Sequence, residues 1–292
     1  MPRESGFTTT TQVPLYWCAY GAAGATRLLV LHGGPGAHHD YLLPQMLELA
    51  GTYELVFYDQ RGGGRSKTDD RAPITWRTHV EDLVCVIEEL RFSDQLSLVG
   101  YSWGGLLALL YAVETSARPW QPLRRLVLID PAPVDREHRA AFEREMARRQ
   151  AAPEIQRMRE ELASSGMRER DPEAYRHRVF ELSVAGYFAH PERARDLTPF
   201  RVMGRVQQSV WDSLGDYDLT PQLGAVGVPT LIVHGRQDPI PVASSELIAR
   251  AIPQSSLVLL EDCGHVPYVE QPVALFTAVK EFLAATNPTT LS

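Results

Sequence analysis

The sequence predicts an α/β fold, in which a mostly parallel, doubly wound sheet carries an inserted helical cap. Short and nearly continuous runs of Val, Leu and Ile recur along the chain, as expected for strands buried on both faces of a parallel sheet. Amphipathic segments alternate with these runs, which is the pattern of successive βαβ units. The interval between Asp130 and Val228 breaks this rhythm, because it has helical patterns and no strand signal.

Individual strands and helices follow from these two patterns. The apolar runs that predict parallel strands are Leu28–Leu31, Leu55–Tyr58, Leu96–Val99, Leu126–Ile129, Thr230–Val233 and Leu257–Leu260. The amphipathic segments that predict helices between them are His79–Leu90, Trp103–Val113, Ala243–Ala251 and Val273–Ala284. The Thr10–Tyr20 region carries a weaker signal for antiparallel edge strands, which we expect at the start of the sheet.

The long interval predicts a separate helical unit. Three charged stretches within it have helical periodicity: Glu137–Arg149, Glu154–Ala163 and Pro172–Val184. A single crossover between parallel strands needs far fewer residues than this interval provides. We therefore expect residues 133–223 to form a cap inserted into a core domain made of residues 1–132 and 224–292.

Composition and charge exclude several classes of function. The formal net charge of −7 comes with no basic block, which argues against nucleic acid as a partner. The N-terminal stretch lacks the apolar core of a signal peptide, and no run approaches the roughly 18 apolar residues of a membrane helix. Three widely spaced cysteines show no metal-site spacing. We expect a cytoplasmic protein without metal, cofactor or membrane contact, and the oligomeric state stays open.

The stretch GYSWG at residues 100–104 places a serine between two glycines. It joins the strand that ends at Val99 to the helix that begins at Trp103, which is the context of a nucleophile elbow. Small neighbours allow the strained turn, and the helix N-terminus offers unpaired N–H groups. The pattern also fits a glycine-rich turn with an inert serine, so Ser102 needs partners elsewhere to count as a nucleophile.

Two residues at other strand ends supply those partners. A serine hydroxyl needs a base to take its proton, and the base needs an acid to orient it. Asp238 follows the Thr230–Val233 strand and His265 follows the last strand, in the chain order Ser, Asp, His. Asp130 also ends a strand and is a rival acid, but Asp238 lies nearer the His265 end in the expected strand order.

Two glycine-rich loops complete the pattern. HGGPG at residues 32–36 follows the first strong strand, so we expect the backbone N–H of Gly34, with that of Trp103, to form an oxyanion hole. A phosphate-binding loop is excluded because no Gly-Lys-Ser/Thr follows. DQRGGGRS at residues 59–66 follows the next strand, and we interpret Asp59 and Arg61 as scaffold residues that tie neighbouring loops together.

These motifs together resemble the α/β-hydrolase fold, and more narrowly the proline iminopeptidase family of serine aminopeptidases. HGGPG combined with DQRGxGxS is fairly specific for that family, whereas GxSxG and the final GH at residues 264–265 are shared by nearly all α/β-hydrolases. The resemblance spans most of the chain outside the cap. It implies a Ser102–Asp238–His265 catalytic triad with oxyanion donors at Gly34 and Trp103.

The cap departs from the family pattern. Family aminopeptidases hold the substrate's free α-amine with cap glutamates, one of them in an ENHYF stretch. The nearest stretch here is VAGYF at residues 184–188, so the expected glutamate is Val184. Glu181 lies one helical turn earlier and is the substitute we consider first, with Tyr187 and Phe188 as pocket candidates. Further carboxylates stand near the end of the cap, at Asp212, Asp216 and Asp218.

The expected activity is that of a serine hydrolase working through an acyl-enzyme. The preferred substrate is a small molecule or short peptide from which an N-terminal residue is released, as the resemblance implies. Alternative substrates for the same triad are small apolar esters, lactones and amides, or the C–C bonds that some members of the fold cleave. A ligand-binding receptor without catalysis is a third hypothesis, whose mark would be a broken triad.

Overall fold

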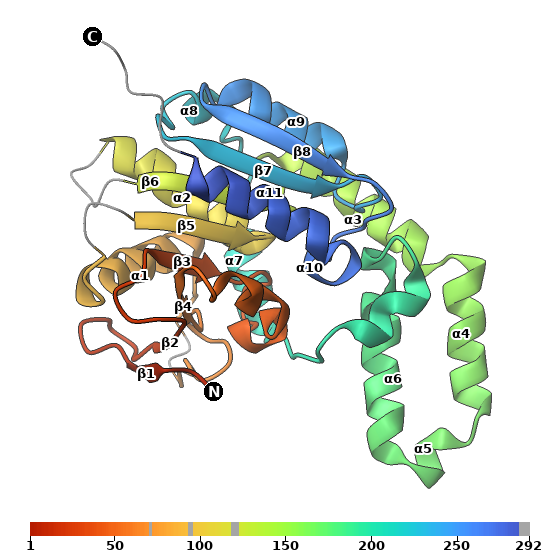
Figure 1. The fold of residues 1–292 in the computed structure, drawn as a ribbon. Helices are drawn as coiled ribbons and strands as arrows, with labels where there is room; N and C mark the ends of the chain where they lie inside the picture. The colour runs from red at the N-terminus through yellow and green to blue at the C-terminus, as the bar shows by residue number, and fades with distance from the viewer. Residues whose placement is uncertain (70–71, 93–95, 118–122, 286–292) are drawn as a thin grey trace.

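A single mostly parallel sheet organises the computed structural model, which describes residues 1–69, 72–92, 96–117 and 123–285 (Figure 1). In that part of the chain the strand order is β1-β2-β4-β3-β5-β6-β7-β8. The strands are β1 Glu4–Phe7, β2 Tyr16–Tyr20, β3 Arg27–Leu31, β4 Glu54–Tyr58, β5 Leu96–Tyr101, β6 Leu123–Ile129, β7 Thr230–Gly235 and β8 Ser255–Leu260. Only the β1–β2 and β2–β4 pairings are antiparallel; all other neighbouring strands pair parallel.

Every predicted parallel strand is present, and the edge strands differ in place from the prediction. Strand β2 covers only the last part of the expected Thr10–Tyr20 region. Its partner β1 lies earlier, at Glu4–Phe7, and is mostly exposed. A short exposed strand needs no apolar run, and β1 is held by backbone pairing with β2, so hydrophobic patterning did not reveal it.

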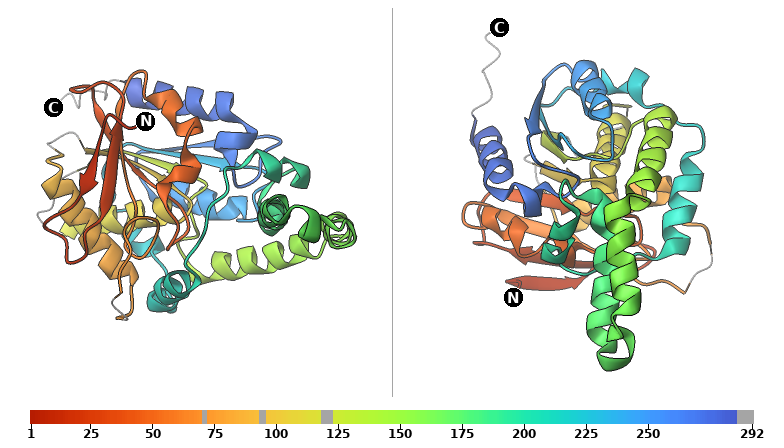
Figure 2. Two further views of the ribbon diagram at one scale, coloured as in Figure 1. Left: turned by 90° about the horizontal axis from the view of Figure 1, so that it is seen from below. Right: turned by 90° about the vertical axis from the view of Figure 1, so that its right-hand side faces the viewer.

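Two hydrophobic layers cover the sheet, one on each face (Figures 1 and 2). Alternate residues of β3 divide between them, with Leu29 and Leu31 in one layer and Leu28 and Val30 in the other. The helices of the first layer are α1 Trp76–Glu89, α2 Trp103–Ala117, α8 Thr220–Leu223 and α9 Val242–Ala251. The second layer contains α10 Pro267–Glu270, α11 Pro272–Ala284 and the 3₁₀ turns His39–Leu42 and Gln45–Leu49.

The segment between β6 and β7 is helical and lies beyond the carboxyl ends of the parallel strands (Figure 1). Besides α8, its helices are α3 Arg136–Gln150, α4 Pro153–Ser164, α5 Met167–Arg170, α6 Pro172–Val184 and α7 Gly204–Leu214, with 3₁₀ turns at Ala185–Tyr187 and Pro191–Asp196. Its two ends meet where Asp135 and Asp218 form an isolated β-bridge. Helices α4 to α6 project from the body of the molecule, as both views of Figure 2 show.

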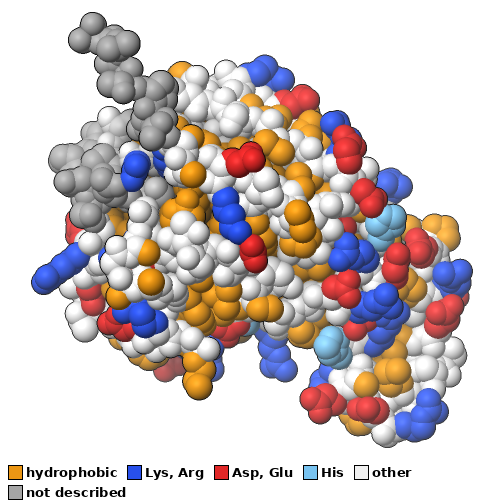
Figure 3. All heavy atoms as spheres, in the orientation of Figure 1, with side chains coloured by type: hydrophobic (Ala, Val, Ile, Leu, Met, Phe, Trp, Pro, Cys, Tyr) orange, Lys and Arg blue, Asp and Glu red, His pale blue; other side chains and the backbone are white. Residues whose placement is uncertain are grey.

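The projecting helices carry charges of both signs, as Figure 3 shows. Arginines there pair with acids one turn away on the same helix, as Arg157 does with Glu161 on α4 and Arg178 with Glu181 on α6. Such pairs are typical of a solvated helical face. Within the described ranges, no helix combines the length and the apolar character needed to cross a membrane.

Candidate active site

Ser102 lies on a tight turn between β5 and α2. Its backbone has a positive φ of 54°, and its N–H donates to the Ile129 carbonyl oxygen at 2.9 Å. A Cβ at Gly100 would lie 2.4 Å from the Gly104 oxygen, and one at Gly104 would lie 2.1 Å from the Leu31 oxygen. Both positions therefore require glycine, because a side chain there would collide with backbone. The turn exposes the serine hydroxyl at the carboxyl edge of the sheet.

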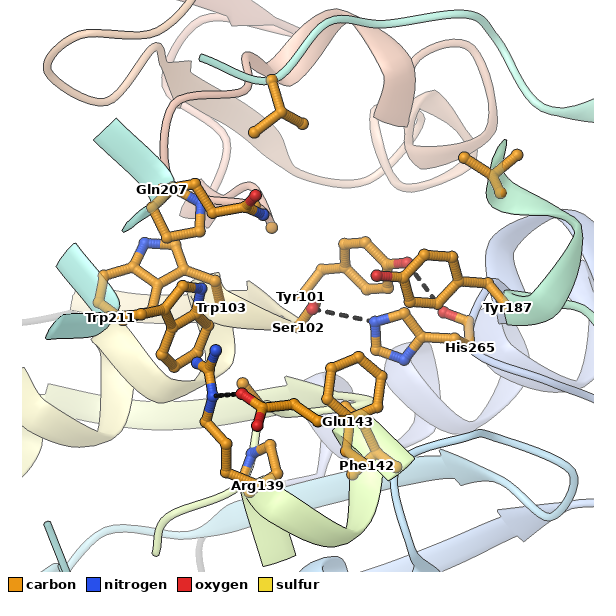
Figure 4. Close-up of a pocket in the computed structure, with 18 of the residues that line it drawn as sticks. Tyr101, Ser102, Trp103, Arg139, Phe142, Glu143, Tyr187, Gln207, Trp211 and His265 are labelled. Carbon is orange, nitrogen blue, oxygen red and sulfur yellow. Dashed lines mark hydrogen bonds and ion pairs between the residues drawn. The ribbon is translucent and has the colours of Figure 1, made fainter. Parts of the chain in front are cut away.

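Ser102, His265 and Asp238 form one chain of hydrogen bonds. Ser102 Oγ lies 2.9 Å from His265 Nε2 (Figure 4), and His265 Nδ1 lies 2.7 Å from Asp238 Oδ2. The Ile240 N–H donates to the other Asp238 oxygen at 2.7 Å. A hydroxyl, imidazole and carboxylate joined in this way can transfer the serine proton to the imidazole during attack on a carbonyl carbon.

The imidazole of His265 is buried and held by aromatic neighbours. Burial lowers its pKa to about 4, so the ring is neutral near pH 7 and can accept a proton. The Tyr187 ring stacks on the imidazole with centroids 5.2 Å apart. The backbone N–H of His265 donates to the Tyr187 carbonyl oxygen at 2.7 Å. The Tyr101 hydroxyl donates to the His265 carbonyl oxygen at 2.8 Å (Figure 4). These contacts fix both the ring and its backbone.

The loop at residues 32–36 faces the turn of Ser102. His32 Nδ1 donates to the Gly33 carbonyl oxygen at 2.9 Å, and the Gly33 N–H donates to the Tyr41 hydroxyl at 2.8 Å. Because a trans peptide is planar, fixing the Gly33 oxygen also fixes the direction of the Gly34 N–H. Trp103 is the first residue of α2, so its backbone N–H has no acceptor within the helix. Gly34 and Trp103 both line the cavity with Ser102, so their two N–H groups stay the expected oxyanion donors.

Gln60 connects that loop to Trp103. Its side-chain N–H donates to the His32 carbonyl oxygen at 2.9 Å, and its oxygen accepts the Trp103 indole N–H at 2.8 Å. The Gln60 backbone N–H also donates to His32 Nε2. Sequence reasoning assigned the DQRGGGRS stretch to scaffold and gave no separate role to its glutamine. The bridging contacts join the loop that carries Gly34 to the side chain of Trp103.

The acidic and basic residues of DQRGGGRS hold neighbouring loops together. Asp59 accepts hydrogen bonds from the His39 ring at 2.6 Å and from the Arg65 backbone N–H at 2.9 Å. Arg61 donates from Nε to Asp82 at 2.8 Å, and its Nη2 makes a second bond to the same carboxylate. These contacts are the ion pairs and hydrogen bonds that the sequence predicts for Asp59 and Arg61.

A cavity of about 660 Å³ opens above Ser102 and His265. Its wall is strongly aromatic, with contributions from Tyr41, Tyr101, Trp103, Phe142, Phe180, Tyr187, Phe200, Trp211, Tyr217 and Tyr268. Both the core and the helices between β6 and β7 contribute to this wall. Such a lining favours an apolar or aromatic substrate group over a strongly charged one.

The cavity also contains an ion pair that the sequence did not reveal. Arg139 and Glu143 lie one turn apart on α3 and pair at 2.8 Å (Figure 4). The Arg139 guanidinium lies over the Trp211 ring, 3.6 Å from its centroid, and Trp211 in turn packs edge-on against Trp103. An Arg and a Glu four residues apart are common on exposed helices, so their spacing carries no signal that these two residues face a cavity.

The cap residues singled out from the sequence lie in different places. Tyr187 lines the cavity, whereas Phe188 is buried and is not among the lining residues. Glu181 is also outside the lining and pairs with Arg178. Of the three aspartates near the end of the cap, Asp212 reaches the lining and the other two do not. The carboxylates that line the cavity are therefore Glu143 and Asp212.

Asp130 and Asp238 lie close together. Three atoms lie within 4.8 Å of one another: one carboxylate oxygen of Asp130, one of Asp238, and a ring nitrogen of His234. Asp238 makes the hydrogen bond to the His265 ring, in agreement with the strand order used to prefer it over Asp130. The rival acid is nevertheless a direct neighbour of the preferred one.

Comparison with known proteins places this geometry in a family. Residues 26–272 match the family described as alpha/beta hydrolase fold. The proline iminopeptidase of Thermoplasma volcanium is 28% identical over 90% of each chain, and that of Saccharolobus solfataricus is 27% identical over 96% of this chain and 92% of its own. The crystal structure of VinJ superposes with a TM-score of 0.70 at 25% identity, covering 97% of this chain and 99% of VinJ. The chain belongs to the alpha/beta hydrolase fold family and is a hydrolase.

Proposed function

We propose that the protein is a serine hydrolase that acts through an acyl-enzyme and releases N-terminal residues from small peptides or amides, in the manner of a proline iminopeptidase. The observation that carries the proposal is the hydrogen-bonded chain of Ser102, His265 and Asp238 beneath a cavity of about 660 Å³. Likeness to proline iminopeptidases along most of the chain supports the substrate class.

The reaction follows from the roles of these residues. His265 Nε2 takes the Ser102 proton as Oγ attacks the substrate carbonyl carbon, and the N–H groups of Gly34 and Trp103 stabilise the oxyanion. Asp238 accepts a hydrogen bond from the Nδ1–H of His265 and stabilises the positive charge of the imidazolium. His265 then gives its proton to the leaving amine, and the acyl group stays on Ser102. Water, deprotonated by the same imidazole, hydrolyses the ester and restores the free serine.

An aminopeptidase also needs a partner for the substrate's free amine, because a charged amine buried without one is costly. Glu143 is the carboxylate we assign to this role, in place of Glu181. It lines the cavity with a side chain that is 45% exposed, and it already pairs with a cation, Arg139. The incoming ammonium would share Glu143 with Arg139 or replace it. Asp212, which accepts a hydrogen bond from Gln208 at 2.7 Å, is the second carboxylate within the lining.

We also propose that residues 133–223 act as a cap over the site and that the protein works in the cytoplasm. Phe142, Glu143 and Tyr187 all come from this segment and all line the cavity, so changes in it alter substrate choice without touching the triad. The cytoplasm is proposed because the cysteines are free thiols, and a reducing compartment keeps thiols in this state; they are Cys18, Cys85 and Cys263.

A second candidate function is hydrolysis of small uncharged esters. The ion pair between Arg139 and Glu143 favours it, because a carboxylate already neutralised by a guanidinium attracts a substrate amine less strongly. The aromatic wall would then receive an apolar acyl group. Both candidates use the same triad and differ only in what the cavity selects.

Three substrates separate the two candidates. We would compare turnover of proline p-nitroanilide, its N-acetylated form and p-nitrophenyl butyrate, with Ser102→Ala as the blank. An aminopeptidase cleaves the free anilide and loses at least about tenfold in kcat/KM on acetylation or in Glu143→Gln, as expected when a hydrogen bond to a charged group is removed. Glu181→Gln is the matched control and should change little. Ester cleavage alone would contradict the aminopeptidase proposal and support the second candidate.

A further inference from the structure

The loop after β6 brings a second carboxyl group against Asp238. Asp130 is fully buried and has a positive φ of 41°. Its Oδ1 accepts the Gly235 N–H at 2.8 Å. Its Oδ2 is buried and receives no donor from the described residues. One oxygen of Asp238 lies within 4.8 Å of an oxygen of Asp130, so Asp238 is the nearby acceptor that a protonated Asp130 would face.

Two ionised carboxylates cannot hydrogen-bond, because neither has a proton to donate. Asp238 already accepts hydrogen bonds from the Ile240 N–H and from His265 Nδ1. Asp130 accepts only one, from Gly235. The negative charge is therefore better stabilised on Asp238, and the shared proton belongs on Asp130.

The neighbouring charged groups among the described residues do not reverse this balance, since the Arg149 guanidinium lowers the pKa of Asp238. His234 donates from Nε2 to the Ile240 carbonyl oxygen, and its Nδ1 lies 2.9 Å from the Ser245 hydroxyl. Burial lowers the pKa of His234 to about 4, so the ring is neutral near pH 7. The titratable groups around Asp130 are Tyr101, His234, Asp238, Cys263, His265 and Tyr268. Burial raises the pKa of Asp130 well above its ordinary value, and the Asp238 charge raises it further.

We propose that Asp130 is a positioning residue that stays protonated and donates a hydrogen bond from Oδ2 to Asp238. This rests on the proposed function, in which Asp238 is the acid of the triad. The pair then carries one negative charge in place of two, and Asp238 has three donors that fix the plane of its carboxylate. The His265 ring is oriented by that carboxylate, so Asp130 acts on the reaction through Asp238 and touches no substrate.

Infrared difference spectroscopy detects whether the Asp130 carboxyl group is protonated, and this measurement does not depend on enzyme activity. A protonated carboxylic acid has a C=O stretch separate from the bands of a carboxylate. The Asp130→Asn spectrum should lack one acid band that wild-type protein shows at neutral pH. Asp59→Asn is the matched control: despite its burial, hydrogen bonds from His39 and Arg65 hold the pKa of Asp59 below its ordinary value, so only carboxylate bands should change. An unchanged acid band in Asp130→Asn would overturn the proposal.

Kinetics of two variants test the donor role. The amide of Asp130→Asn can donate to Asp238 as the acid does, so kcat should stay within about threefold of wild type. Asp130→Ala removes the donor, and kcat should fall about 10- to 100-fold with little change in KM, the usual range for a hydrogen bond to a charged group. Equal losses in both variants, with both folded by circular dichroism, would contradict the proposal. If a fluorophosphonate failed to label wild-type protein at Ser102, the proposed function would be wrong. The infrared result would still show whether Asp130 is protonated.

Discussion

The side-chain oxygen of Gln60 accepts the indole N–H of Trp103 at 2.8 Å, while its nitrogen donates to the His32 carbonyl oxygen at 2.9 Å. Gln60 is fully buried. One amide therefore joins the two segments that carry the expected oxyanion donors. An oxyanion hole stabilises the transition state only when its donors are held in place before the reaction.

Replacing Gln60 with Leu keeps the volume and removes both hydrogen bonds. We expect kcat to fall by about 10-fold or more, because each donor segment loses its fixed position and the His32 oxygen is left unpaired. KM should change little, since Gln60 is not among the residues lining the cavity. Gln254→Leu, at an exposed glutamine bonded to the Gly227 oxygen, is the control. A rise in KM without loss of kcat would show that Gln60 shapes the cavity and does not position the donors.

The pH dependence of kcat/KM should show the low pKa of His265. Burial disfavours the imidazolium and lowers the pKa from 6.5 to about 4. The neutral base therefore persists in acid, and activity should be lost only as the pH falls through about 4. The rate profile of p-nitrophenyl butyrate checks this, because that substrate does not itself titrate in the range. Samples returned to neutral pH control for unfolding, and an acid limb near the ordinary histidine value would contradict the argument.

Substitution of Gly104 should act through the fold. A Cβ at this position would lie 2.1 Å from the Leu31 carbonyl oxygen, so β3 and α2 would have to move apart. We expect Gly104→Ala to destabilise the protein by about 1–3 kcal/mol or more, the range for overpacking a core. Thermal unfolding measures the loss. Gly227→Ala, where a Cβ meets nothing within 4 Å, is the matched control and should unfold close to wild type.

Much of the site was predictable because parallel strands end at one edge of a sheet. Ser102 directly follows β5, and Asp238 and His265 follow β7 and β8 after short loops, so the shared edge brings the three together. The Arg139–Glu143 pair lies on a helix whose periodicity looks solvent-exposed, and only packing against Trp211 shows that it faces the cavity. The contact between Asp130 and Asp238 was equally hidden. The sequence presented them as rivals, whereas pairing of β6 with β7 makes them neighbours.

The proposed catalysis depends above all on Ser102 as the nucleophile. Intact mass after exposure to a fluorophosphonate tests this directly, with wild type and Ser102→Ala treated in parallel at neutral pH. We predict one covalent adduct on wild-type protein, mapped by peptide analysis to Ser102, and none on Ser102→Ala. An adduct that persists in Ser102→Ala, or wild-type protein that stays unlabelled while hydrolysing its substrate, would contradict the account.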